Sequence, residues 1–342
     1  MPAKMKALAF LGKNTIKYSE VPIPSIKDDE VLMQIKSVGI CGTDLHIYRG
    51  GLAVKPGTVL GHEFSGVVAK MGKNVRNVQV GDRVVGEHVI TCKKCIYCKT
   101  GKPNLCSDRA IIGVHRSGAL AEYLAIPADL VYPFPSEVSF EEAALVEPLS
   151  IAVYAVREAG YLLGKRVGVV GQGPVGLLVD QVLSAAGSLV TGMDVRENTL
   201  AFAKSKGWAH HLINTKTEDI TERLKDIGSA DGFDVTFEVV GIEATAEMSF
   251  AITRRAGQVF LLGVFSSPAK INLMNIVQKE LRVQGSWTCF NAFPESIDLV
   301  VRKRVDLKSL ITHRYSAKDG EKAFREAESY ADNRIKSVVN FF

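Results

Sequence analysis

The stretch Arg166-Val-Gly-Val-Val-Gly-Gln-Gly-Pro-Val-Gly176 decides the fold of this chain. Residues 166–170 have the short apolar pattern of a buried strand, and Gly171, Gly173 and Gly176 follow with the spacing Gly-x-Gly-x-x-Gly. The first glycine permits a tight turn, the second admits a pyrophosphate close to the backbone, and the third lets a helix pack closely on the strand. The stretch therefore predicts a strand, a turn and a helix whose N-terminus binds a dinucleotide.

The next predicted strand, residues 189–193, ends in Asp194. An acidic side chain at this position accepts hydrogen bonds from the adenosine ribose and repels a 2′-phosphate, which favours NAD over NADP. Arg196 follows closely and is able to soften this preference, so NADP stays open. The residues that we assign to cofactor binding are Gly171, Gly173, Pro174, Val175, Gly176, Asp194, Leu262, Gly263 and Val264.

The sequence changes character along its length, which for 342 residues indicates two domains. Short strand-like segments separated by glycines fill the first ~150 residues and predict an irregular β-barrel. Beyond them, apolar strands alternate with helices, which predicts a doubly wound parallel sheet of the α/β class. Predicted strands are 31–38, 64–69, 82–85, 166–170, 189–193, 235–239, 258–263 and 335–341, and predicted helical segments are 141–145, 151–156, 176–186 and 199–206.

The composition excludes several partners. The net charge is only +5, and no aromatic residues interleave with the densest basic segment, 302–304, so we expect no nucleic-acid partner. No segment approaches the ~20 apolar residues that cross a bilayer, and the N-terminus lacks the apolar core of a signal peptide. We therefore expect a cytoplasmic protein without a membrane partner, in which clustered cysteines bind metal rather than form disulfides.

Four cysteines are clustered in a polar, lysine-rich segment: Cys92, Cys95, Cys98 and Cys106. Such a segment has little apolar surface to bury, whereas four thiolates hold one tetrahedral zinc ion and leave no position for substrate. We therefore predict a structural zinc site. Two other interpretations are free cysteines and an iron–sulfur cluster, although the bacterial ferredoxin run places its fourth cysteine after three residues and follows it with proline.

Three further segments carry ligands for a second metal ion. They contain Cys41, the pair His62 and Glu63, and Glu147 before a proline. A catalytic zinc needs about three protein ligands and one open position, which these residues would supply. Each residue alone also fits an ordinary structural role, so the prediction depends on their combination with the dinucleotide motif.

The chain resembles the zinc-containing medium-chain dehydrogenases. The resemblance is carried by the segments 39–44, 61–63, 81–84 and 147–148, the four-cysteine lobe and the glycine motif, in the family's order and spacing. It implies a GroES-like β-barrel catalytic domain formed by residues 1–155 and 291–342, with the zinc lobe at 87–110, and a Rossmann domain at 156–290. It also implies a homo-oligomer, either a dimer or a tetramer.

The resemblance assigns roles to individual residues. Cys41, His62 and Glu63 match the catalytic zinc segment, and Glu147 matches an acidic position that binds the zinc or stays close to it. Thr43 and His46 match positions that relay the substrate proton. No cysteine occurs near residue 147, unlike the Cys₂His ligand set of simple alcohol dehydrogenases.

The resulting hypothesis is an enzyme with two zinc ions per chain and NAD. Segment 147–150 looks like the sorbitol dehydrogenase branch, and segments 86–92 and 112–116 look like threonine and galactonate-type dehydrogenases. His115 and Arg116 fall in a segment that lines the family's substrate cleft, and arginine binds carboxylates. We therefore expect a small-molecule substrate, a polyol or sugar acid, whose secondary alcohol is oxidised. Alternatives are threonine 3-dehydrogenase-type oxidation, a zinc-free quinone reductase and a catalytically silent NAD-binding protein.

Overall fold

The computed structural model describes residues 4–329 and 333–342. The chain forms two compact units, the first from Met1–Glu147 and Phe293–Phe342 and the second from Pro148–Ala292. The family resemblance implies a division after residue 155. The structure divides the chain near the start of helix α4 (Val146–Glu158).

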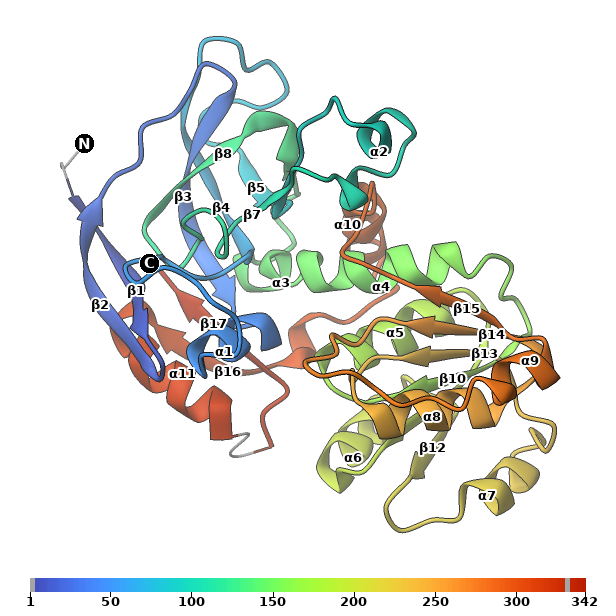
Figure 1. The fold of residues 1–342 in the computed structure, drawn as a ribbon. Helices are drawn as coiled ribbons and strands as arrows, with labels where there is room; N and C mark the ends of the chain where they lie inside the picture. Colours follow the sequence, from blue (N-terminus) through green and yellow to red (C-terminus); the bar gives the residue numbers. More distant parts are fainter. Residues whose placement is uncertain (1–3, 330–332) are drawn as a thin grey trace. The chain divides into compact units, whose positions relative to one another are not determined.

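The second unit contains one six-stranded sheet in which every pair of neighbouring strands is parallel. The first strand of the unit, β10, lies in the middle, and the chain winds outward to one edge and then to the other (Figure 1). This is the doubly wound arrangement that the alternation of strands and helices predicted. In spatial order the strands are β12 (His211–Asn214), β11 (Leu189–Asp194), β10 (Arg166–Val170), β13 (Phe233–Glu238), β14 (Thr253–Leu261) and β15 (Arg282–Gly285).

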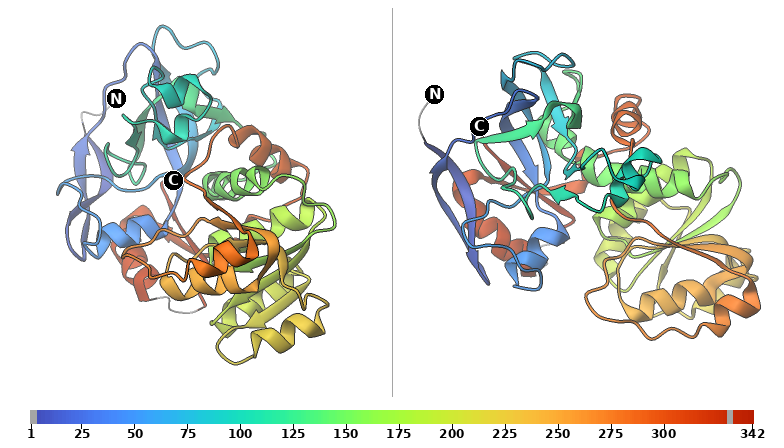
Figure 2. Two further views of the ribbon diagram at one scale, coloured as in Figure 1. Left: turned by 45° about the vertical axis from the view of Figure 1, so that its right-hand side comes forward. Right: turned by 45° about the horizontal axis from the view of Figure 1, so that its top comes forward.

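Helices flank both faces of this sheet (Figures 1 and 2). The first begins after Gly173, with Pro174 in its first turn, where the missing N–H of proline is not needed. None of the helices in the described part of the chain has the length and hydrophobicity needed to cross a membrane. The helices of this unit, apart from α4, are α5 (Pro174–Ala185), α6 (Glu197–Lys206), α7 (Ile220–Asp226), α8 (Glu243–Ile252) and α9 (Met274–Lys279).

The first unit is built on a mixed seven-stranded sheet and a separate hairpin of β1 and β2. Inward-facing residues of the hairpin, the sheet and α11 share one apolar core, which includes Leu8, Met33, Phe64 and Phe324. Its strands are β1 (Lys4–Gly12), β2 (Thr15–Pro22), β3 (Glu30–Gly39), β4 (Glu63–Met71), β5 (Arg83–Gly86), β8 (Tyr123–Pro127), β9 (Val131–Pro133), β16 (Ile311–Ser316) and β17 (Lys336–Asn340).

The C-terminal segment completes this first unit. Strand β17 pairs antiparallel with β3 and parallel with β16, so the last strand of the chain lies beside one of the first. Helix α11 lies against the hairpin (Figure 2), and Lys17 on β2 forms an ion pair with Glu321 at 3.0 Å. The helices of the unit are α1 (Gly42–Tyr48), α2 (Ile96–Lys99), α3 (Phe140–Ala144), α10 (Phe293–Val301) and α11 (Gly320–Ser329), and β6 (Val89–Ile90) pairs with β7 (Ala110–Ile111) beside α2.

One carboxyl group in the core of the second unit is unusual. Asp180 on α5 is fully buried, and neither of its oxygens has a hydrogen-bond partner. Burial raises the pKa of Asp180 well above its ordinary value, and the nearby Gln172 side chain opposes this shift only in part. The folded chain therefore favours the protonated acid.

We predict that Asp180→Asn stabilises the chain increasingly as pH rises. The unfolded wild-type chain loses this proton at a lower pH than the folded chain, so the contribution of Asp180 is present at acid pH and is lost as pH rises towards the folded pKa. The difference in unfolding free energy between variant and wild type should grow by about 1.4 kcal/mol per pH unit over that interval. Denaturant unfolding between pH 5 and pH 8 measures it, with the exposed Asp231→Asn as the control. A difference that does not change with pH would contradict the prediction.

Candidate active site and metal centres

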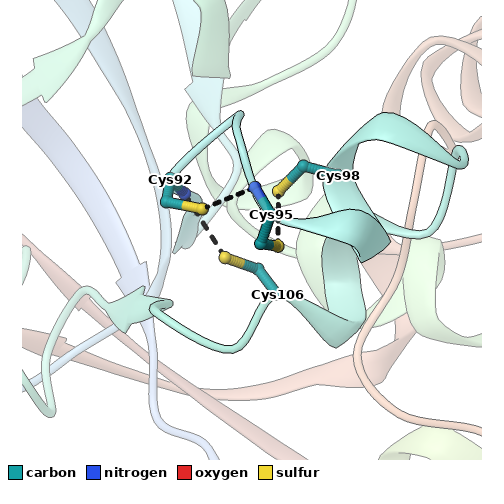
Figure 3. Close-up of side chains that lie close together, drawn as sticks. All are labelled: Cys92, Cys95, Cys98 and Cys106. Atoms are coloured by element: carbon teal, nitrogen blue, oxygen red, sulfur yellow. Dashed lines mark hydrogen bonds between the residues drawn. The ribbon is translucent and has the colours of Figure 1, made fainter.

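The four clustered cysteines converge on one point. Their sulfur atoms all lie within 4.8 Å of one another, and Figure 3 shows the four side chains directed towards a common centre. Backbone N–H groups already donate to two of the sulfurs: Cys95 N lies 3.3 Å from Cys92 Sγ, and Cys92 N lies 3.3 Å from Cys106 Sγ. Four sulfurs at this spacing suit a tetrahedral ion that has no open position.

The electrostatics of this cluster favour thiolate. Backbone N–H groups of Cys98 and Ser107 lower the pKa of the Cys95 thiol to about 6. Burial and the neighbouring sulfurs of Cys95 and Cys106 raise the pKa of Cys98 to about 11. One sulfur is therefore largely ionised at neutral pH, and a metal ion would displace the protons from the others.

A second group of possible ligands lies at the end of β3 and the start of β4. The sulfur of Cys41, a ring nitrogen of His62 and a carboxylate oxygen of Glu63 lie within 4.8 Å of one another. Cys41 is the N-cap of α1, Glu63 is the first residue of β4, and His62 immediately precedes that strand. His62 and Glu63 are buried, and Cys41 is partly exposed, so the group is reached from one side.

Asp44 holds the two halves of this group together. Its carboxylate is fully buried and accepts hydrogen bonds from Cys41 N at 2.9 Å and Gly61 N at 3.2 Å. The same carboxylate lies 3.5 Å from His62 Nδ1, which leaves Nε2 as the atom available to an ion. Asp44 ends the segment 39–44, which carries the family resemblance, but the sequence alone suggested no role for it.

Lys336 is a second residue that sequence reasoning missed. Its Nζ lies 2.6 Å from Glu63 Oε1, and both side chains are almost completely buried. Burial opposes the charge of the lysine, but the carboxylate of Glu63 outweighs it and raises the pKa of Lys336. The signal was available, because a lysine inside the apolar strand 335–341 requires a buried partner.

Glu147 occupies a different position from Glu63. Its Oε1 lies 3.0 Å from Nδ1 of His88, and the centroid of the His88 ring lies 5.4 Å from that of His62, with the two rings tilted by 46°. The sequence analysis left open whether Glu63 or Glu147 is the third ligand. In the structure a carboxylate oxygen of Glu63 belongs to the group of ligand atoms within 4.8 Å of one another. The carboxylate of Glu147 is paired with His88 instead.

This second group suits a cation. Burial opposes protonation of His62, but Asp44 and Cys41 outweigh burial and raise the pKa of His62 well above its ordinary value. The same negative potential attracts a metal ion, which would take the place of that proton. Glu63 Oε2 is also buried without a hydrogen-bond partner. The sulfur, nitrogen and oxygen donors form a zinc ligand set of the catalytic kind.

Two residues expected to relay protons lie next to this group on α1. Thr43 and His46 are three residues apart, so they lie on one face of the helix, and both are partly exposed. The ring of His46 packs over Gly51, where a Cβ atom would come within 2.4 Å of it. A residue larger than glycine at position 51 would therefore displace the imidazole.

His115 and Arg116, the expected substrate residues, make other contacts. Ile111 N donates to His115 Nδ1 at 3.1 Å. Arg116 Nη2 lies 3.3 Å from Oε1 of Glu30, a buried residue at the start of β3. Part of the guanidinium is thus already paired with a carboxylate within the chain.

The glycine motif of the second unit has the geometry of a dinucleotide loop. Gly171 has a φ of +107°, which favours glycine, and a Cβ atom on Gly176 would lie 1.8 Å from the carbonyl oxygen of Gly171. Gly173 is the N-cap of α5, so Pro174 and Val175 form the first turn of that helix. Free N–H groups at this helix end suit a pyrophosphate.

Asp194 lies next to this loop at the end of β11. Its Oδ2 accepts a hydrogen bond from Gln172 N at 2.7 Å, and Arg196 donates to the same carboxylate from Nε and Nη2, both at 3.2 Å. Burial opposes ionisation, but Arg196 and the backbone N–H groups outweigh it and lower the pKa of Asp194. The carboxylate is therefore ionised, with a cation beside it.

Exposed apolar side chains lie at the same edge of the sheet. Val195, Val240 and Val264 are 56%, 43% and 65% exposed, and each lies just beyond the carboxyl end of a strand. Ligands of doubly wound sheets bind at this edge, where the strand order reverses. In this sheet the reversal falls between β10 and β13.

Comparison with known proteins places both units in one group. A family model described as the alcohol dehydrogenase GroES-like domain matches residues 27–136, and one described as zinc-binding dehydrogenase matches residues 174–302. Sorbitol dehydrogenase of Bacillus subtilis is 34% identical over 99% of this chain and 98% of its own. D-xylulose reductase of Saccharomyces cerevisiae is 37% identical over 98% of this chain and 97% of its own. L-threonine 3-dehydrogenase of Bacillus velezensis is 36% identical over 95% of this chain and 96% of its own.

Solved structures agree with these similarities. An alcohol dehydrogenase from Escherichia coli CFT073, crystallised with NADH, superposes with a TM-score of 0.93 at 30% identity. A zinc-binding dehydrogenase from Sinorhizobium meliloti 1021, bound to NADP, gives a TM-score of 0.93 at 29% identity. Each comparison covers 99% of this chain and 100% of the other.

We predict that Cys95→Ser lowers the zinc content from two ions per chain to one and lowers the temperature of unfolding. The variant loses one of four sulfur ligands of a site that holds a polar lobe together. Elemental analysis of the purified protein measures the metal. Cys289→Ser, which changes a buried cysteine outside both groups, should keep both ions. Iron with visible absorbance in the wild type would refute a zinc site.

Proposed function

The chain belongs to the family of zinc-containing medium-chain alcohol dehydrogenases, and we propose that it oxidises a secondary alcohol of a polyol or sugar acid to a ketone with NAD. The first unit is its GroES-like domain and the second its Rossmann domain. The observation that carries the proposal is the group of Cys41, His62 and Glu63 in a chain that also has a complete dinucleotide loop.

The residues of the first unit support an alcohol as the substrate. Cys41, His62 and Glu63 would hold zinc, with Glu147 close by, and zinc supplies a Lewis acid that polarises a substrate oxygen. Thr43 would accept the proton of the substrate hydroxyl at its own hydroxyl, and His46 would pass that proton towards solvent. Asp44 orients His62, and Lys336 neutralises part of the charge on Glu63.

The residues of the second unit support a nicotinamide coenzyme as the hydride acceptor. The loop after β10 would bind the pyrophosphate, and Asp194 would accept the ribose hydroxyls. Arg196 is the unusual feature, because it offers a cation to a 2′-phosphate. We propose NAD as the preferred coenzyme, since the ionised Asp194 repels that phosphate.

The substrate class follows from the relatives and the ligand set. Sorbitol dehydrogenase and D-xylulose reductase are named for polyhydroxylated compounds. Two carboxylates, Glu63 and Glu147, are buried here, and no cysteine occurs near residue 147, unlike the Cys₂His ligand set of simple alcohol dehydrogenases. His115 and Arg116 remain proposed substrate residues, although Arg116 is paired with Glu30 and a carboxylate would have to share it.

The alternatives receive less support. A zinc-free quinone reductase or a silent NAD-binding protein has no use for the grouped ligands beside Thr43 and His46. Threonine 3-dehydrogenase-type activity has a relative of its own at 36% identity. L-threonine is therefore included as a separate substrate in the activity measurements below.

We also propose a homo-oligomer, a dimer or tetramer, located in the cytoplasm. Strand β15 is an edge strand whose residues are all exposed, and Val277 and Val283 nearby are 67% and 39% exposed. An exposed edge strand with exposed apolar side chains on it and beside it can pair with another chain. Four of the cysteines are grouped as possible metal ligands, and clustered cysteines serve this purpose in a reducing compartment.

We predict NAD-linked oxidation of a polyol or an aldonate in a panel that also includes L-threonine. His62→Ala should lower kcat at least about 100-fold, because a ligand of the Lewis acid is lost, and should leave NADH binding nearly unchanged. Steady-state kinetics and NADH fluorescence titration measure the two effects. His211→Ala, an exposed histidine of the other unit, is the matched control. Full turnover by a zinc-stripped protein would contradict the proposal.

We predict that Asp194→Ala raises the KM for NAD about 10-fold or more and lowers the KM for NADP. The substitution removes the acceptor of the ribose hydroxyls and releases Arg196 to bind a 2′-phosphate. Arg196→Ala should change the preference in the opposite direction, and the double variant should discriminate weakly. An NAD-to-NADP ratio of kcat/KM that is the same in wild type and Asp194→Ala would rule out this assignment.

A further inference from the structure

One buried carboxylate of the second unit has no part in the scheme above. Glu238 is the last residue of β13 and is fully buried. Its Oε1 accepts hydrogen bonds from Val240 N at 2.9 Å, Gly241 N at 2.8 Å and Thr245 Oγ1 at 2.7 Å. One oxygen therefore holds the turn between β13 and α8.

The same residue also holds the loop after the next strand. The carbonyl oxygen of Glu238 accepts from Leu262 N at 2.8 Å and Gly263 N at 3.1 Å. Its second carboxylate oxygen, Oε2, has no hydrogen-bond partner and lies 2.5 Å from the place where a Cβ atom on Gly263 would be. Glu238 thus packs against both loops, those that contain residues 240–241 and 262–264.

The two loops are in direct contact through glycines. A Cβ atom on Gly263 would lie 2.1 Å from Gly241 N, and one on Gly241 would lie 2.7 Å from the backbone of Val264. Side chains at either glycine would push the loops apart. The exposed Val240 and Val264 are therefore held at a fixed spacing beyond the ends of β13 and β14.

The topology indicates which half of a dinucleotide these loops meet. The glycine loop follows β10 and Asp194 ends β11, so a bound dinucleotide would place its pyrophosphate and adenosine on one side of the point where the strand order reverses. The other mononucleotide half of a doubly wound sheet begins at β13. The nicotinamide half then extends over the loops that Glu238 holds, and Val240 and Val264 offer apolar surface to its ring.

We propose that Glu238 is a positioning residue for the nicotinamide half of the coenzyme. It acts through the backbone of the two loops, which keep Val240 and Val264 in place. This inference rests on the proposed binding of a nicotinamide coenzyme.

The experiment compares the binding of NADH with that of ADP-ribose, which lacks the nicotinamide. Glu238→Ala should weaken NADH binding about 10-fold, because three donors lose a buried acceptor and the loops separate. Its affinity for ADP-ribose should fall clearly less than its affinity for NADH. Val240 lies against Gly171 of the glycine loop, so a small loss is expected there, but ADP-ribose has no nicotinamide ring that could lose contact with Val264. Calorimetric titration measures both ligands, and the emission shift of bound NADH reports the surroundings of the ring.

Further variants separate positioning from general loss of structure. Glu238→Gln keeps an acceptor oxygen and should restore NADH binding to within about threefold of wild type. Thr245→Val removes one donor on a partly exposed side chain and should give a smaller loss in the same direction. Asp234→Asn is the matched control, because Asp234 accepts hydrogen bonds from Arg166 N and Arg254 at the opposite end of the same strand. It should leave the ratio of the two affinities unchanged.

The outcomes are distinguishable. Equal weakening of NADH and ADP-ribose in Glu238→Ala, or wild-type affinity for both, overturns the role of Glu238 and leaves the proposed function intact. If Glu238→Ala does not fold, Thr245→Val and Glu238→Gln decide by the same ratio. Wild-type protein that binds neither ligand overturns the proposed function, and this inference with it.

Discussion

The ammonium of Lys336 and the carboxylate of Glu63 lie 2.6 Å apart in the interior of the first unit. A buried charge is tolerated only when it is paired, so neither side chain is stable there without the other. Strand β17 can bring Lys336 to this place only by pairing with β3, and β3 also leads directly to Cys41. The ion pair, the sheet register and the position of the candidate metal ligands therefore depend on one another. Asp44 adds a second constraint of the same kind by joining Cys41, Gly61 and His62.

Local sequence was enough to predict the parts of the fold that local chemistry determines. Strand β10 has the predicted bounds, and the glycine loop leads into α5, because turn, helix start and close packing are all specified within a few residues. Strand β14 was predicted at 258–263 and spans Thr253–Leu261, since its limits follow from pairing with β13 and β15. The two units divide at Pro148, inside helix α4, and a helix that continues across a boundary gives the sequence no turn signal there.

Local sequence likewise predicts some residues of the candidate site and not others. The ligand types were visible as Cys41, His62 and Glu63, because their motifs are short and contiguous. The residues that orient them were not, since Lys336 and His88 acquire meaning only from partners distant in sequence. Glu238 was likewise unremarkable as one acid at the end of a strand. Its role depends on its hydrogen bonds to two loops that follow different strands, β13 and β14.

The first unit is discontinuous, and this has a consequence for the order of synthesis. Glu63 precedes Lys336 by 273 residues, and the whole second unit lies between them. At typical rates of translation Glu63 is synthesised roughly 14–55 s before its counter-ion. The Rossmann unit, which is one continuous segment, can complete its sheet during that interval. During that interval Glu63, at the start of β4, has no counter-ion, so the first unit cannot complete its fold. In a nascent chain the first unit is therefore exposed to proteases and chaperones for longer than the second unit.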